Sequence, residues 1–168
     1  MAASIDATIG GPSSNSYVTV AEADAYFDGR LDAADWTAAS ADEKIRALIT
    51  ATLRLEQETY EGAKYRSDPA DQRLAWPRAG ATDQNGWAYD TDIIPEPVQR
   101  AQMELALAML GSDLLSDTGL EGFEQVHVGP LSITPRQAHE AGDLPRNVRR
   151  HIAHVLLSSA GAVHVMRG

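Results

Sequence analysis

The sequence contains no cysteine. This absence excludes disulfide bonds, thiolate zinc sites, iron–sulfur clusters and cysteine nucleophiles. Aromatic residues make up only 6 % of the 168 residues, and no stretch reaches the roughly 18 consecutive apolar residues of a membrane-spanning helix. The first residues, MAASIDATIGG, lack positive charge and a long apolar run, so we expect no signal peptide.

The sequence also lacks the motifs of catalysis. The glycines at 10–11 are not followed by the lysine of a phosphate-binding loop, and the serines at 158–159 lack the flanking glycines of a hydrolase nucleophile. His151 and His154 are close enough on one predicted helix to hold a metal ion, but that helix offers no carboxylate one turn away. We therefore expect no enzymatic activity, no metal and no cofactor.

Positive charge is scarce and unevenly placed. The chain has 14 Lys and Arg residues against 24 Asp and Glu residues, a formal net charge of −10. Residues 136–168 reverse this balance, with five arginines and two carboxylates. General nucleic-acid binding needs a basic face that displaces counterions, so the acidic body argues against it. The basic end favours packing against an acidic surface, such as the body of a neighbouring copy.

Two capping boxes predict where the first helices begin. Residues 19–22 (TVAE) and 40–43 (SADE) each place a hydroxyl and a carboxylate so that both satisfy free backbone amides. The first helix is expected over 19–30 and the second over 41–61, ended by Gly62. Their apolar stripes are Val20, Ala23, Phe27 and Leu31 in the first helix, and Ile45, Leu48, Ile49, Thr52, Leu53 and Tyr60 in the second.

Two more helices are predicted further along the chain. Pro95 and Pro97 open a helix of about 95–110, where a missing N–H costs nothing. Its second half, AQMELALAML, has only two polar residues, so we expect it at the centre of the fold, packed against the second helix. The last helix, about 145–159, has an apolar stripe at Val148, Ile152, Val155 and Leu156.

Residues 125–134 predict a β-hairpin. Gly129 and Pro130 supply a two-residue turn with glycine at its first central position. This turn places four apolar residues on one face: Val126, Val128, Leu131 and Ile133. Because a lone hairpin is only marginally stable, we expect it to pack on the helices or to pair with a strand of a neighbouring subunit.

The segment LAWPRAG, residues 74–80, places a tryptophan in the long polar connection of residues 63–94. Pro77 disfavours helical geometry at Trp76, so we expect the indole on an extended segment. We interpret Trp76, Pro77 and Arg78 as a clasp, in which Trp76 packs across the core helices and Arg78 stays exposed enough to bridge subunits. The alternative is that Trp76 is an interface residue.

Arg146, Arg149 and Arg150 form the basic part of the last helix. They could be solvated, bind an acidic protein surface or line a channel for DNA. The chain then continues into an apolar segment, residues 160–168, and exposed apolar tails normally need a partner that receives them. We therefore predict a partner-binding site formed by the three arginines together with Val163, Val165, Met166 and Arg167.

Three segments together resemble a family of small tailed-phage proteins. They are NSYV (15–18) running into AEADAYF, LAWPRAG (74–80), and IPEPV (94–98) running into QRAQMELAL. The resemblance covers about residues 15–134. The family is often labelled DnaT-like single-stranded DNA-binding protein, and in phage particles such proteins look like head–tail connectors, also called adaptor or head-completion proteins.

A connector of this kind implies a mainly α, ring-forming fold, a small bundle of about four helices with one β-hairpin. The ring, typically of twelve copies, lies under the portal protein, extends the DNA channel without sequence-specific binding, and docks a downstream tail or stopper protein. The arginines and the tail would contact the portal, and the hairpin a neighbour or the tail. The resemblance also implies assembly in the bacterial host cytoplasm and a place in the virion neck, with no membrane partner.

In this interpretation residues 1–16 are an N-terminal arm, 17–159 the helical adaptor domain and 160–168 a C-terminal tail. The alternative function is a single-stranded DNA-binding accessory protein of replication. Such a protein should offer a basic groove with aromatic platforms on which bases stack. Because the body is acidic and several aromatic residues fall on core stripes, the sequence favours the connector.

Overall fold

The computed structural model describes residues 3–66, 68, 71–111 and 144–157. Within these ranges the fold has five α-helices and one two-stranded antiparallel sheet, which confirms the mainly α class. The helices are α1 (Val20–Asp28), α2 (Ala34–Ala38), α3 (Ala41–Leu55), α4 (Glu96–Gly111) and α5 (Arg146–Ile152), and the strands are β1 (Ala63–Lys64) and β2 (Arg78–Ala79). The predicted hairpin of residues 125–134 lies outside the described residues.

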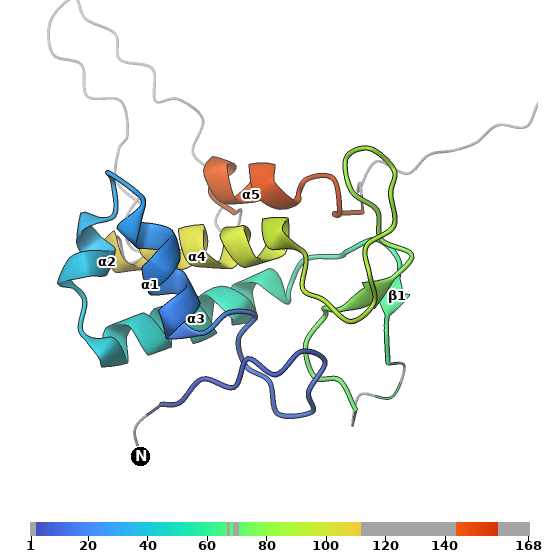
Figure 1. Ribbon diagram of the computed structural model, residues 1–168, viewed down its shortest axis with the longest axis horizontal. Coiled ribbons are helices and arrows are strands. Elements are labelled where there is room, and N and C mark those ends of the chain that lie inside the picture. The colour runs from blue at the N-terminus through green and yellow to red at the C-terminus, as the bar shows by residue number, and fades with distance from the viewer. Residues whose placement is uncertain (1–2, 67, 69–70, 112–143, 158–168) are drawn as a thin grey trace, which may run out of the picture.

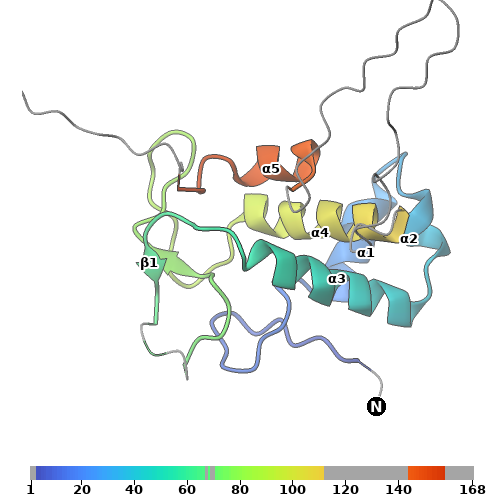
Figure 2. The same cartoon turned by 180° about the vertical axis from the view of Figure 1, so that it is seen from behind.

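Helix α4 lies at the centre of the bundle, between α3 on one side and α5 on the other (Figure 1). Helix α2 also packs against α4, and α1 packs against α3. The strands lie at the end of the bundle opposite α2, as the view from behind also shows (Figure 2). Residues 101–106 of α4 are all buried. The prediction of a central helix packed on several sides is therefore confirmed.

Both predicted capping boxes form. The hydroxyl of Thr19 accepts a hydrogen bond from the N–H of Glu22 at 3.2 Å, and the Glu22 carboxylate accepts one from the N–H of Thr19 at 2.7 Å. Ser40 and Glu43 exchange the same pair of bonds at the start of α3. Because a cap involves only neighbouring residues, the starts of α1 and α3 follow from sequence alone.

Helices α3 and α5 end well before residues 61 and 159, so the predicted helix ends were wrong. The same pairing of backbone groups accounts for both early ends. The N–H of Glu61 donates to the carbonyl of Val155 at 2.8 Å, and the N–H of Leu157 donates to the carbonyl of Thr59 at 2.9 Å. The two segments thus form a short antiparallel bridge. Their backbone groups bond across the molecule instead of continuing two helices.

Gly62 does not end α3 but lies just before β1. Its φ of +69° is favourable only for glycine. A Cβ atom at this position would lie 2.2 Å from the carbonyl oxygen of Ala79. Glycine is therefore required here by the close approach of β2.

Two positions predicted in the core are exposed instead. Leu31 is fully exposed, because α1 ends at Asp28 and Leu31 lies in the turn before α2. Leu53 is 54 % exposed. The buried residues of α3 are Ala47, Leu48, Ala51, Thr52 and Leu55. Trp36 in α2 is buried, but five residues are too few for a helical periodicity, so α2 gave no signal in the sequence.

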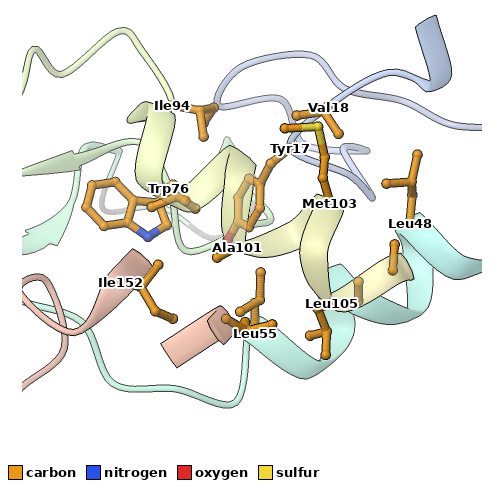
Figure 3. Close-up of a cluster of buried hydrophobic side chains, with 14 of the residues drawn as sticks. Tyr17, Val18, Leu48, Leu55, Trp76, Ile94, Ala101, Met103, Leu105 and Ile152 are labelled. Atoms are coloured by element: carbon orange, nitrogen blue, oxygen red, sulfur yellow. The ribbon is translucent and has the colours of Figure 1, made fainter. Parts of the chain in front are cut away.

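The three segments of the family resemblance meet in the core. Tyr17, Trp76 and Ile94 come one from each segment, and all three are buried. Figure 3 shows them around α4, with Ile152 of α5 completing the cluster. Each segment that carries the resemblance therefore contributes a residue to the interior of the fold.

Buried polar side chains tie these segments together. The amide oxygen of Gln102 accepts from the N–H of Tyr17 at 3.0 Å, and its NH₂ group donates to the Ser16 hydroxyl at 2.7 Å and the Leu48 carbonyl at 3.1 Å. Glu56 accepts from the Tyr17 hydroxyl and, at 2.9 Å, from the N–H of Ala75. The first segment is thus bonded to α4, and the first and second are both bonded to Glu56 at the end of α3.

Candidate nucleic-acid interface

Trp76 of the predicted clasp lies in the core. Its side chain is 1 % exposed, and its ring meets those of Tyr60 and Tyr89 edge to face, with centroids 5.6 and 6.3 Å apart. Its indole N–H has no hydrogen-bond partner among the described residues. The peptide bond between Trp76 and Pro77 is cis. This burial leaves no indole surface for a partner molecule.

Arg78 of the clasp makes hydrogen bonds within its own chain. Its guanidinium group donates to four backbone carbonyls, those of Tyr60, Glu61, Gly62 and Ala75. Burial lowers the pKa of this half-buried side chain. The bonds hold β2 against the segment that joins α3 to β1. A role in bridging subunits, which the sequence analysis suggested, stays a prediction.

The predicted arginine site has a defined scaffold in α5. Val148 and Ile152 are buried against α4, whereas Arg146, Arg149 and Arg150 are exposed on the outer face of the helix. The structure thus brings the three arginines together. The other predicted members, Val163, Val165, Met166 and Arg167, lie outside the described residues, as do Val126, Val128, Leu131 and Ile133 of the predicted hairpin.

Most aromatic side chains of the described ranges belong to the core. The buried ones are Tyr17, Phe27, Trp36, Tyr60 and Trp76. Two are exposed: Tyr65, at 51 %, and Trp87, at 75 %. Only an exposed ring can stack on a nucleobase. Among the described residues, Tyr65 and Trp87 are therefore the two candidate platforms for base stacking.

Tyr65 follows β1 on a tightly held backbone. Its N–H donates to the carbonyl of Pro77 at 3.1 Å, and the next N–H, of Arg66, donates to the side-chain oxygen of Gln72 at 3.1 Å. Gln72 is completely buried, and its NH₂ group donates to the carbonyls of Leu74 and Pro77. The exposed ring is thus presented by a rigid support.

Three basic residues belong to the same part of the chain as Tyr65. Lys64 and Arg66 are its sequence neighbours, and the Lys64 ammonium donates to the backbone carbonyl of Arg73 at 2.9 Å, which brings the Arg73 backbone alongside Lys64. We call Lys64, Tyr65, Arg66 and Arg73 the Tyr65 platform. Two exposed carboxylates, Asp68 and Asp71, share the loop and leave a small positive balance. Neither a motif nor a periodicity in the sequence predicted this site, although the triplet KYR in an acidic body was a usable signal.

Trp87 has the opposite surroundings. Asp83 accepts from the N–H groups of Asn85 at 2.8 Å and Trp87 at 2.9 Å. These hydrogen bonds, with that of Trp87 foremost, lower the pKa of the Asp83 carboxyl, so it is anionic at neutral pH. Asp90 and Asp92 follow along the chain. These carboxylates make the surroundings of Trp87 unfavourable for a phosphate backbone, so the Tyr65 platform is the better candidate for a nucleic-acid site.

The described residues contain no group of three or more His, Asp and Glu side chains that could hold a metal ion. None of the helices in the described ranges is both long and apolar enough to cross a membrane.

Comparison with known proteins identifies the family. No curated protein and no solved structure matches the chain. A family model described as "Putative DnaT-like ssDNA binding protein" matches residues 1–168, the whole chain. This description corresponds to the DNA-binding alternative of the sequence analysis more than to the head–tail connector. The chain belongs to the family of DnaT-like single-stranded DNA-binding proteins.

Proposed function

We propose that this protein binds single-stranded DNA without catalysing a reaction, and that the Tyr65 platform is where a base stacks. The observation that carries the proposal is an exposed tyrosine on a hydrogen-bonded backbone, in a segment that also carries the basic residues Lys64, Arg66 and Arg73. Single-strand binders combine such a ring with basic groups that follow the phosphates. The family description supports the same activity.

The acidic net charge is compatible with a local site of this kind. At physiological salt, exposed charges are screened beyond about 8 Å, so distant carboxylates contribute little at Tyr65. The platform offers three cations, and single-strand binding weakens with salt in proportion to the phosphates neutralised, with a logarithmic slope of about −0.7 per phosphate. We therefore expect modest affinity with a slope near −2, about three such contacts.

Replacing Tyr65 with alanine should weaken binding to single-stranded DNA about 5- to 160-fold, because one stacked base contributes about 1–3 kcal/mol. Fluorescence anisotropy of a labelled oligothymidine at about 150 mM salt measures the change. Tyr65→Phe keeps the stacking surface and should bind like the wild type. Leu31→Ala removes an exposed apolar side chain elsewhere and is the matched control.

Two results would count against this proposal. If Tyr65→Ala binds as well as the wild type, the stacking site lies elsewhere on the molecule. If the wild type itself shows no binding at low salt, where phosphate contacts are strongest, single-strand binding is not the function of this chain.

We propose the head–tail connector of a tailed phage as the second candidate function. Its support is the exposed arginine face of α5 on an otherwise acidic chain, a charge pattern suited to docking on an acidic partner. In this proposal the protein is a structural component of the virion neck. Copies form a ring on the portal protein, and the genome passes through without sequence-specific contacts.

Replacing Arg146, Arg149 and Arg150 together with glutamate should abolish or strongly weaken assembly on a portal, in a salt-dependent way. The measurement is electron microscopy of the protein mixed with portal protein. The matched control replaces Lys64, Arg66 and Arg73 with glutamate, which reverses their charges. This variant should still assemble on the portal but should lose DNA binding. Assembly that is indifferent to the α5 arginines would exclude them from docking, and the absence of any wild-type ring on the portal would exclude the connector.

A further inference from the structure

The connection between β2 and α4 contains a tight turn that ends in an exposed tryptophan. The N–H of Asp83 donates to the carbonyl of Trp87 at 2.8 Å, and the N–H of Gly86 donates to the carbonyl of Asp83 at 3.0 Å. Gly86 has a φ of +85°, which glycine adopts without strain. Thr82 and Ala88 form an antiparallel bridge on either side of the turn. We call residues 82–88 the Trp87 turn, and its hydrogen bonds fix its backbone.

The base of the Trp87 turn is joined to the core. The N–H of Tyr89 donates to the carbonyl of Ala81 at 3.0 Å, and the Tyr89 hydroxyl lies 2.9 Å from His154 Nε2. The Tyr89 ring also meets the buried ring of Trp76 edge to face. Both overall views show the connection next to the segment that follows α5 (Figures 1 and 2). Trp87 is nevertheless 75 % exposed, so its own α5 does not cover the ring.

An exposed tryptophan on a fixed backbone is suited to binding another protein. Tryptophan and arginine are enriched among the few residues that dominate the binding energy of interfaces. A backbone that is already ordered also loses little conformational entropy when it docks. Asp83, Asp90 and Asp92 make the same connection acidic. The complementary surface should therefore present cations that can both contact an indole ring and pair with carboxylates.

Helix α5 of a second copy offers such a surface. Arg146, Arg149 and Arg150 are exposed at positions i, i+3 and i+4, which share one face of a helix. The seven residues of α5 include no carboxylate that would repel the turn. A guanidinium group within about 6 Å of a ring centroid is attracted to the face of the ring, most strongly for tryptophan. One chain thus carries both halves of a complementary pair.

We propose that the Trp87 turn of one copy docks on the arginine face of α5 in the next copy. The Trp87 ring stacks on the guanidinium groups, and the carboxylates of its connection pair with them. Because the two surfaces are different parts of the molecule, the contact is heterologous and joins copies head to tail. Chains of net charge −10 otherwise repel one another, so these local opposite charges direct the association. The contact rests neither on DNA binding at Tyr65 nor on docking to a portal.

Sedimentation velocity of the full chain over a range of concentrations tests the proposal. One turn on one helix makes a small interface, and small interfaces are weak, so the wild type should associate at tens to hundreds of micromolar. Association should be lost at about 1 M salt, where charges are screened beyond about 3 Å. Trp87→Ala should raise the dissociation constant at least about 30-fold, as for other residues that dominate an interface. Leu31→Ala removes another exposed apolar side chain and should associate like the wild type.

A mixing experiment identifies the two halves of the contact. Replacing Arg146, Arg149 and Arg150 with glutamate leaves the Trp87 turn intact, whereas Trp87→Ala leaves the arginines intact. Each variant should be monomeric alone. Their equimolar mixture should form a dimer, because one intact surface from each variant is enough for a single heterologous contact. Circular dichroism checks that both variants fold.

Three results would overturn the proposal. They are a wild type that stays monomeric throughout this range, a Trp87→Ala variant that associates like the wild type, and a mixture of the two variants that stays monomeric. The samples contain neither DNA nor portal protein. Failure of this contact is therefore visible separately from failure of either proposed function.

Discussion

Replacing Trp76 with alanine should lower the free energy of unfolding by about 3–5 kcal/mol, the range for truncating a buried tryptophan. The side chain is 1 % exposed and packs against Tyr60 and Tyr89. Its loss leaves a cavity between the loop that follows β1 and helix α4, and the surrounding rings can close it only in part. Denaturant unfolding followed by circular dichroism measures the change.

Trp87→Ala is the matched control, because Trp87 is 75 % exposed. Its removal should change stability by no more than about 0.5 kcal/mol. The same pair of variants separates an anchor from an interface residue. If Trp76→Ala lowers the free energy of unfolding by less than about 1 kcal/mol, well under the range for a core tryptophan, Trp76 is not an anchor of the core.

Replacing Gln102 with leucine should lower the free energy of unfolding by about 2–3 kcal/mol, because a buried polar group left without its partner costs about 1–3 kcal/mol. The N–H of Tyr17 loses the acceptor that Gln102 supplies at 3.0 Å. The carbonyl of Leu48 is less affected, because it also accepts from the Thr52 hydroxyl. Leucine is close in size to glutamine, so the effect reports hydrogen bonding more than volume.

Denaturant unfolding gives the magnitude, and amide hydrogen exchange gives the location. The Tyr17 amide should exchange much faster in Gln102→Leu than in the wild type. Gln57→Leu replaces an exposed glutamine next to α3 and should stay within about 0.5 kcal/mol of the wild type. Unchanged protection of Tyr17 would show that Gln102 does not hold the N-terminal segment.

Both predictions concern residues that also carry the family resemblance. Trp76 belongs to LAWPRAG and Gln102 to QRAQMELAL, and both are buried. The resemblance in these segments is therefore stronger evidence for the fold than for the function. The candidate binding groups, Tyr65 and the arginines of α5, lie outside these segments. The surface residues proposed to bind DNA therefore lie outside the three segments that carry the resemblance.

The sequence determined those features that depend on neighbouring residues. Thr19 and Ser40 mark helix starts because a cap is made within one turn. Pro95 and the nearly uniform apolar run that follows it placed α4 at the centre, since a helix without a polar face must be covered on several sides. The arginines of α5 were identified because positive charge is concentrated at that end of an otherwise acidic sequence.

Only the tertiary structure decided the features that join distant segments. α3 and α5 end before residues 59–61 and 155–157, which pair with each other, and neither segment encodes this pairing alone. Tyr65 becomes a platform because Gln72 and Pro77 hold its backbone, and Arg78 turns inward because four carbonyls converge on it. The physical reason is common to all three. Hydrogen bonds between distant residues compete with local preference, and their partners come together only when the chain is folded.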